Sequence, residues 1–193
     1  MSHTVWLRIN SLATFAVTAL AILVALASLT DVTHSCTPTS SRGPGTPPRV
    51  VVTGFERFVN VSGEDEAIVQ MDFDVDMSKC FSWNTKLIFA HVVMSYATEA
   101  QKSNAVTAWD AIATTPEASV FKGLRMAKYR WRDVQNGLRG AEVHVNLSWA
   151  VTPVVGKLWR GSTKVGKFRM PTEYIAPRPA EAAKGGGRVP GMP

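Results

Sequence analysis

The sequence predicts a mainly β protein in which one N-terminal transmembrane helix precedes an antiparallel β-sandwich. Three observations indicate this fold. Residues 9–30 form one uninterrupted segment without charge. Later segments, above all 69–76 and 143–151, alternate between apolar and polar residues, which is the period of a strand with one buried face. After the first segment, no long stretch shows the 3.6-residue period of an amphipathic helix.

The membrane helix is predicted at residues 12–29, an apolar run of 18 residues. As a helix this run measures about 27 Å, close to the hydrocarbon thickness of an endoplasmic reticulum bilayer. Arg8 precedes it and Asp31 follows it. The positive-inside rule then places residues 1–11 in the cytosol and the rest of the chain across the membrane. The segment is therefore expected to be the signal-anchor of a single-pass type II protein.

A cleavable signal peptide is the alternative, because residues 25–27 read Ala-Leu-Ala after the apolar run. Cleavage after Ala27 would release a soluble β-sandwich that acts as a secreted or cell-surface binding domain. The weakly basic N-terminus and the length of the apolar run favour a retained anchor. Both interpretations place the folded domain outside the cytosol.

Composition permits one globular domain. The chain has 193 residues, 46% of them hydrophobic, and six tryptophans. Its net charge of +6 is uneven, since residues 1–120 carry a net charge of −4 and residues 122–193 a net charge of +10. The basic half could meet lipid headgroups or an acidic partner, or could be a solvated surface. Nucleic acid is not an expected partner in the lumen.

Residues 30–48 are predicted to be a stalk, because Pro, Ser, Thr and Gly dominate them. Cys36 lies in this stalk and Cys80 lies in the domain. An oxidising compartment would allow a disulfide, but the sequence leaves open whether the two cysteines pair. Two isolated cysteines do not form a structural zinc site.

The domain is predicted at residues 49–176, and residues 177–193 are predicted to be a disordered tail. The run Leu87–Val93 is apolar on both faces, which predicts a central buried strand. A helical turn is an alternative at 106–112. The predicted strands lie at Val50–Phe55, Val69–Val75, Leu87–Val93, Val106–Ile112, Val120–Leu124 and Val143–Val151, with two more in 157–170 around a turn at Gly161.

Two motifs imitate binding loops. The segment 161–167 is similar to a phosphate-binding loop, but Phe168 stands where Ser or Thr is needed, so a hairpin turn is expected. Asp72, Asp74 and Asp76 begin like a calcium loop that lacks its Gly and Glu. They are expected to be the solvent face of a strand. No cofactor or metal site is predicted.

No catalytic group is predicted either. Of the four histidines, His3 is placed in the cytosol, His34 in the stalk and His144 on a wet strand face. His91 is expected to be a core residue with satisfied hydrogen bonds. The Gly-x-Ser-x-Gly motif does not occur in the chain.

Two N-glycosylation sequons begin at Asn60 and Asn146. Asn60 follows a predicted strand in an accessible loop. Asn146 lies on the polar side of a strand, where a glycan requires that this side be uncovered. At least one sequon is expected to carry a glycan.

Several ordered motifs resemble the family of signal peptidase complex subunit 3. The similarity extends over about residues 5–176. The motifs are Phe81-Ser-Trp83-Asn84-Thr-Lys86, Ser95-Tyr96-Ala-Thr98, Asn104-x-Val106-x-x-Trp109-Asp110-x-Ile112, Lys128-Tyr129, Asn136-Gly137-Leu138-Arg139-Gly140 and Leu147-Ser148-Trp149-x-Val151-x-Pro153-x-x-Gly156-Lys157, with Asn10-Ser11-Leu12 at the start of the anchor.

This resemblance implies an uncleaved anchor in the endoplasmic reticulum membrane and a lumenal β-sandwich. It implies an accessory, non-catalytic subunit that supports the removal of signal peptides from nascent secretory and membrane proteins. The catalytic serine peptidase would be a different subunit, against which the lumenal domain packs. The other subunits and the lipid bilayer are further implied partners, and no small-molecule substrate is expected.

Three aromatic residues of these motifs allow two interpretations. Phe81, Trp83 and Trp109 are either core residues or anchors of an interface. Core positions are expected, because large aromatic side chains mostly complete a core.

Overall fold

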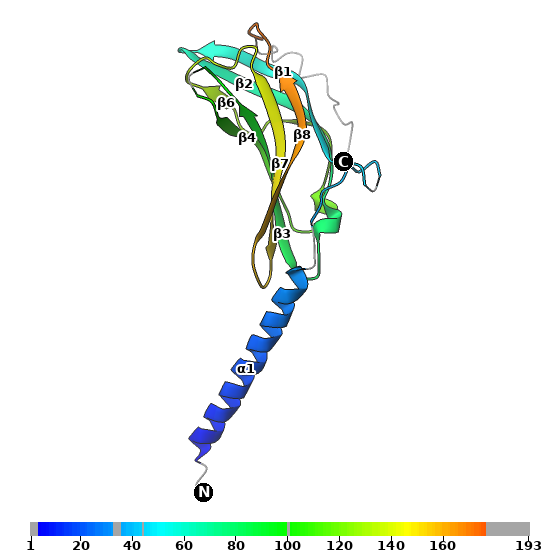
Figure 1. Cartoon of the computed structure of the whole chain (residues 1–193), viewed down its shortest axis with the longest axis vertical. Helices are drawn as coiled ribbons and strands as arrows, with labels where there is room; N and C mark the ends of the chain where they lie inside the picture. The colour runs from blue at the N-terminus through cyan, green and yellow to red at the C-terminus, as the bar shows by residue number, and fades with distance from the viewer. Residues whose placement is uncertain (1–3, 33–35, 44, 100, 177–193) are drawn as a thin grey trace, which may run out of the picture.

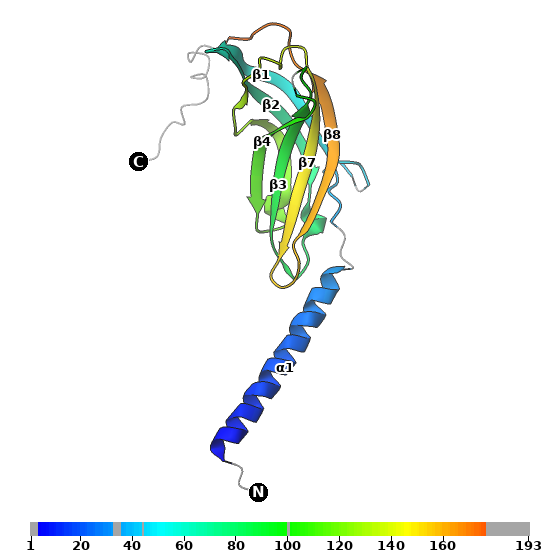
Figure 2. The ribbon, with the colours of Figure 1, turned by 60° about the vertical axis from the view of Figure 1, so that its left-hand side comes forward.

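The computed structural model describes residues 4–32, 36–43, 45–99 and 101–176. One long helix, α1 (Val5–Val32), stands at one end of an elongated β domain (Figures 1 and 2). Its segment Val5–Thr30 is long and apolar enough to cross a membrane, and none of it is buried within the protein. The helix extends beyond both ends of the predicted segment 12–29.

The β domain consists of two antiparallel four-stranded sheets, as the sequence predicts. In sheet A, the strand order is β1-β2-β5, and β6 pairs with β2 beside β5. In sheet B, the order is β4-β3-β7-β8. The strands are β1 (Arg49–Val61), β2 (Glu64–Asp76), β3 (Thr85–Tyr96), β4 (Asn104–Ala113), β5 (Val120–Met126), β6 (Trp131–Asp133), β7 (Glu142–Pro153) and β8 (Trp159–Arg169).

The core lies between the two sheets and follows the alternation of the sequence. Strand β2 buries Val69, Met71, Phe73 and Val75 with at most 2% of each side chain exposed. Strand β7 buries Val143, Val145, Leu147 and Val151 on the facing sheet. Because successive side chains of a strand point to opposite sides, each strand supplies every second residue to the same core.

The segment after the helix is attached to the domain. Cys36 forms a disulfide with Cys80 of the short 3₁₀ helix η1 (Ser78–Cys80). Thr39 pairs with Asp76 at the end of β2 through two backbone hydrogen bonds of 2.7 and 2.9 Å. The cysteine pairing that the sequence left open is therefore made, and it draws the predicted stalk onto the sandwich.

The structure corrects the prediction of a turn at Gly161, because β8 is one continuous strand. Gly161 lies opposite Trp149 in the β7–β8 pairing. A Cβ atom on Gly161 would lie 2.4 Å from a ring carbon of Trp149. The glycine therefore makes room for an indole and does not turn the chain, and the loop between the two strands lies earlier, at 154–158.

The prediction that three aspartates form a solvent face is wrong for Asp74, which is 8% exposed. Residues 40–42 cover this carboxylate, and Ser40 Oγ donates to its Oδ2 at 2.7 Å. Two further differences concern short elements. Residues 106–112 lie in strand β4 and not in a helical turn, and β6 was not predicted because three residues are too few to show a period.

Candidate interaction surface

The outer surface of sheet B carries apolar side chains that no other described element covers. Strand β3 lies between β4 and β7, as its two-sided apolar run predicted. Its residues 88, 90, 92, 94 and 96 are buried in the core, whereas 87, 89, 91, 93 and 95 are half-buried on the outer side. The prediction that β3 is buried on both faces is therefore wrong.

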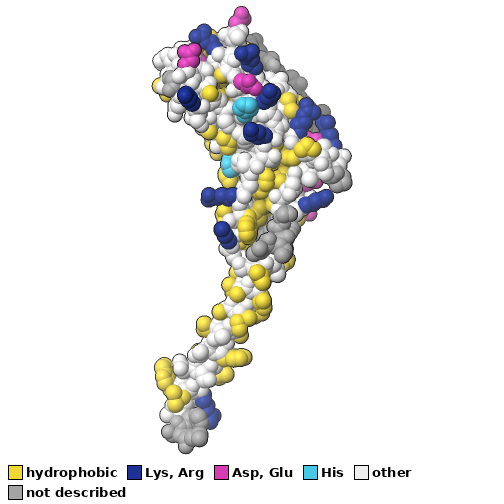
Figure 3. Space-filling model, in the orientation of Figure 1, with side chains coloured by type: hydrophobic (Ala, Val, Ile, Leu, Met, Phe, Trp, Pro, Cys, Tyr) yellow, Lys and Arg dark blue, Asp and Glu magenta, His cyan; other side chains and the backbone are white. Residues whose placement is uncertain are grey.

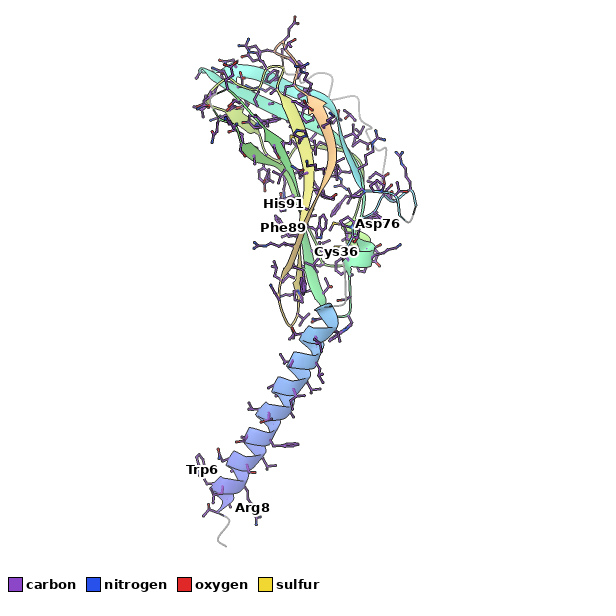
Figure 4. The ribbon with its side chains drawn as sticks, viewed as in Figure 1. Trp6, Arg8, Cys36, Asp76, Phe89 and His91 are labelled. Atoms are coloured by element: carbon purple, nitrogen blue, oxygen red, sulfur yellow. A yellow bond between two sulfur atoms is a disulfide. The ribbon has the colours of Figure 1, made fainter. Side chains whose placement is uncertain are left out.

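Two neighbouring cross-strand rows define this surface. In the apolar row, Phe89 of β3 lies between Ile112 of β4 and Ala150 of β7. Ile112 is 63% exposed. In the polar row, His91 lies between Asp110 of β4 and Ser148 of β7, and Figure 4 shows Phe89 and His91 next to each other on β3. Side chains opposite each other on one face are in contact distance.

The apolar row borders a shallow depression of about 590 Å³. Figure 3 shows hydrophobic side chains gathered over this part of β3, β7 and β8. Arg160 and Ser162 of β8 form its far rim. A partly apolar centre with a polar rim is the composition of a protein–protein interface. The depression is lined by Phe89, His91, Ser148, Trp149, Ala150, Arg160, Gly161 and Ser162.

His91 is the least satisfied polar side chain of this surface. Its ring stacks on Phe89, with centroids 5.1 Å apart and planes inclined by 25°. Its Nδ1 is buried, and no hydrogen-bond partner for it lies among the described residues. Burial lowers the pKa of His91, and the nearby Asp110 carboxylate opposes this effect. The expectation of a satisfied core histidine is therefore wrong, because the ring is half-buried and its Nδ1 has no partner among the described residues.

A charged pair lies at the β4 edge of the outer surface of sheet B. Lys128 Nζ lies 2.9 Å from Asp110 Oδ1. The hydrogen bond from Lys128 lowers the pKa of Asp110, and a hydrogen bond from Tyr129 lowers it further. The carboxylate is therefore ionised at neutral pH.

The order Asp110, His91, Ser148 across the sheet is that of a hydrolase triad, but its hydrogen bonds are different. The Ser148 hydroxyl donates to Ser162 Oγ at 3.0 Å, and the Asp110 carboxylate binds Lys128. Ser148 also lies within a flat strand and not on a tight turn. This arrangement neither activates a nucleophile nor orients a base. In the described ranges, no three His, Cys, Asp or Glu side chains come together to hold a metal ion.

The two sequons lie in different surroundings. Asn60 is exposed at the end of β1, where its Oδ1 accepts from Gly63 N at 3.1 Å and its Nδ2 donates to Asn136 Oδ1 at 2.7 Å. Asn146 is half-buried in the middle of β7 and donates to Ser95 Oγ at 2.8 Å. A glycan on Asn146 would lie on the outer surface of sheet B, beside the polar row.

Sequence reasoning missed the two rows, although one signal for them was present. Apolar residues at both odd and even positions of a strand have two explanations. Either the chain itself covers both faces of the sheet, or one face stays open as a contact surface. The length of the apolar run cannot distinguish these cases. The answer depends on whether another element of the chain reaches the second face.

Comparison with known proteins identifies relatives. The sequence model of one family, described as "Signal peptidase subunit", matches residues 2–173. The chain is 27% identical to "Signal peptidase complex subunit 3" of Dictyostelium discoideum over 63% of this chain and 71% of that protein. With proteins of the same description, it is 30% identical in Schizosaccharomyces pombe over 65% and 69%. In Saccharomyces cerevisiae it is 32% identical over 54% and 58%.

Proposed function

This chain belongs to the signal peptidase subunit family, as a relative of subunit 3 of the complex, and we propose that it is a non-catalytic accessory subunit. The resemblance seen in the sequence motifs is confirmed. In the proposed role, the chain supports the removal of signal peptides from nascent secretory and membrane proteins. The observation that carries the proposal is the family match over residues 2–173, which includes both α1 and the sandwich.

The proposed location is the endoplasmic reticulum membrane, with α1 retained as an anchor, the N-terminus in the cytosol and the sandwich in the lumen. Inclusion of the helix in the family match supports retention, in contrast to cleavage after Ala27. The disulfide between Cys36 and Cys80 supports a lumenal domain, because such bonds persist in oxidising compartments.

The proposed partner is the catalytic serine peptidase subunit, and the proposed contact is the outer surface of sheet B. The exposed Ile112 and half-buried Phe89 would lose contact with water there. A rigid sandwich tethered beside the peptidase raises the local concentration of the binding surface without supplying chemistry.

Depletion of the chain from cells tests the assignment, since secretory precursors should then retain their signal peptides. Normal processing after depletion would contradict it. The contact surface is tested separately with Ile112→Asp, which places a charge in the apolar row. Leu124→Asp is the matched control, because Leu124 of β5 has the same 63% exposure but lies on sheet A.

We expect Ile112→Asp to reduce co-purification of the peptidase subunit from mild detergent by about tenfold or more, as is usual for a charge buried at an interface core. Leu124→Asp should leave co-purification unchanged. Equal recovery with both variants would show that the peptidase binds elsewhere.

A further inference from the structure

The end of the sandwich nearest α1 is built from two loops, and one of them touches the helix. These are residues 81–84, which precede β3, and residues 154–159, which comprise the β7–β8 loop and the first residue of β8 (Figures 1 and 2). Gly156 has φ +116°, and a Cβ atom on it would lie 2.8 Å from Ser28 Oγ of α1. Ala27 and Ser28 are accordingly half-buried in a helix that is otherwise almost entirely exposed. This loop pair therefore sits at the last turns of the helix.

The height of the contact along the helix places it at a membrane surface. Trp6 and Arg8 mark the other end of α1 (Figure 4). Trp6 and Ser28 are separated by 22 positions, which correspond to about 33 Å of helix, slightly more than the roughly 27 Å hydrocarbon layer of an endoplasmic reticulum bilayer. If Trp6 lies in one interface, Ser28 and the loops that touch it lie in the opposite one.

The loop pair exposes large apolar side chains at this height. Trp83 is 72% exposed and Val154 is 65% exposed, while Leu158 and Trp159 are each 38% exposed. The interpretation of Trp83 as a core residue is therefore wrong. By contrast, Trp109 is 6% exposed in the core. Exposed apolar clusters of this kind mark contact surfaces.

Hydrogen bonds hold the two loops together as one unit. Asn84 is 1% exposed, and its Nδ2 donates to the carbonyl of Val155 at 2.7 Å. Its Oδ1 accepts from the Val155 N–H at 3.0 Å, and its own carbonyl accepts from the Val154 N–H at 2.6 Å. The backbone segments that carry Trp83 and Val154 are thus fixed next to each other. Their exposed side chains could enter a lipid layer without any rearrangement of the loops.

The charge of the loop pair suits the headgroup layer. The loop pair and the first residues of the strands that follow it, 81–87 and 154–160, contain Lys86, Lys157 and Arg160 but no Asp or Glu. All three basic residues are exposed, and Lys157 Nζ lies 5.9 Å from the Trp159 ring centroid. Trp is enriched at membrane interfaces, and Lys and Arg reach from there to lipid phosphates.

We propose that the loop pair is a second membrane contact of this protein, in which Trp83 and Val154 enter the interface of the leaflet nearest the domain. The occupant of this surface is the lipid bilayer itself. The contact would fix the height and tilt of the sandwich relative to the bilayer. The inference rests on the membrane insertion of α1 that forms part of the proposed function.

The experiment uses the full chain in lipid nanodiscs that contain shallow or deep spin-labelled lipids. The two native cysteines are bonded to each other, so an introduced cysteine can carry a single fluorescent label. The probe positions are Val154→Cys and Trp83→Cys. Val134→Cys is the matched control, since Val134 is 70% exposed at the opposite end of the domain, after β6. Leu20→Cys, 61% exposed in the middle of α1, reports on insertion of the helix.

We expect shallow spin labels to reduce emission at positions 154 and 83 at least about twofold and to leave position 134 unchanged, because only side chains in the interface approach the lipid. The deep label should quench position 20. Quenching at 20 but not at 154 or 83 would overturn this inference and leave the anchor intact. Absence of quenching at 20 would overturn the anchor and this inference together. A label at 154 that is shielded from both lipid labels and aqueous iodide would show a protein contact and would also overturn the inference.

Discussion

Ser41 binds Asp74 twice: its backbone N–H donates to Asp74 Oδ1 at 2.8 Å, and its hydroxyl donates to the same oxygen at 2.6 Å. Ser40 Oγ donates to Oδ2 at 2.7 Å, and Arg42 Nε lies 3.0 Å from Oδ2. One carboxylate of β2 therefore organises the segment that leads from the helix to the sandwich. A loop with little core of its own is ordered by charge-assisted hydrogen bonds.

This network predicts a pH dependence of stability. The hydrogen bonds from Ser41 and Ser40, with the Arg42 charge, hold the pKa of Asp74 below its usual value, against the opposing effect of burial. The unfolded carboxyl has a pKa of about 3.9, so the stabilisation is present above that pH and is lost as pH falls through the folded pKa. Asp74→Asn should lower the free energy of unfolding at pH 7 by roughly 1–3 kcal/mol.

Urea unfolding of the full chain in detergent, at pH 7 and at about pH 3, measures this effect. The difference between wild type and Asp74→Asn should shrink at the lower pH. Asp72→Asn, at a half-exposed position on the same strand, is the control and should change stability little. A constant difference between wild type and Asp74→Asn at both pH values would contradict the role of the Asp74 charge.

The disulfide predicts that the stability of the domain depends on redox conditions. Cys36 and Cys80 are 44 residues apart, and closing a loop of this length stabilises a fold by roughly 2–4 kcal/mol. Reduction, or Cys36→Ser with Cys80→Ser, should lower the free energy of unfolding by that amount. Thiol labelling under native conditions provides the check, since neither cysteine should react before reduction. Rapid labelling of both residues in the oxidised protein would refute the pairing.

Glycosylation should distinguish the two sequons. Asn60 is exposed at a strand end, whereas Asn146 is half-buried and faces the proposed peptidase contact. We expect endoglycosidase to increase the gel mobility of the wild type and of Asn146→Gln, but not of Asn60→Gln. A mobility shift that disappears in Asn146→Gln would place a glycan on the outer surface of sheet B and would argue against a partner there.

Gly161 tests the packing of sheet B. Because a Cβ atom there would lie 2.4 Å from the Trp149 ring, Gly161→Ala should destabilise the domain by roughly 1–3 kcal/mol through overpacking. Gly54→Ala is the control, since its Cβ atom would meet Gln70 Oε1 at an ordinary 3.7 Å. Thermal unfolding followed by circular dichroism compares the two. Equal melting temperatures would show that the indole moves aside without cost.

The sequence by itself determined the fold class and the family of this protein. The uncharged run 9–30 and the alternation in 69–76 and 143–151 predicted a helix and strands, and the structure contains them. These signals are local: a run of fewer than ten residues already shows which side chains share a face of a strand. The ordered motifs around Trp83, Trp109 and Trp149 identified the family for the same reason, since each can be recognised within a short segment.

Only the tertiary structure decided what each surface position faces. Asp74 looked like a solvent-exposed carboxylate until residues 40–42 were folded over it, and Gly161 looked like a turn until Trp149 was placed beside it. Phe89 was expected to be buried on a two-sided strand, but no described element covers its side of sheet B. Burial depends on contacts between segments that are far apart in the chain, and such contacts leave no periodic signal in either segment alone.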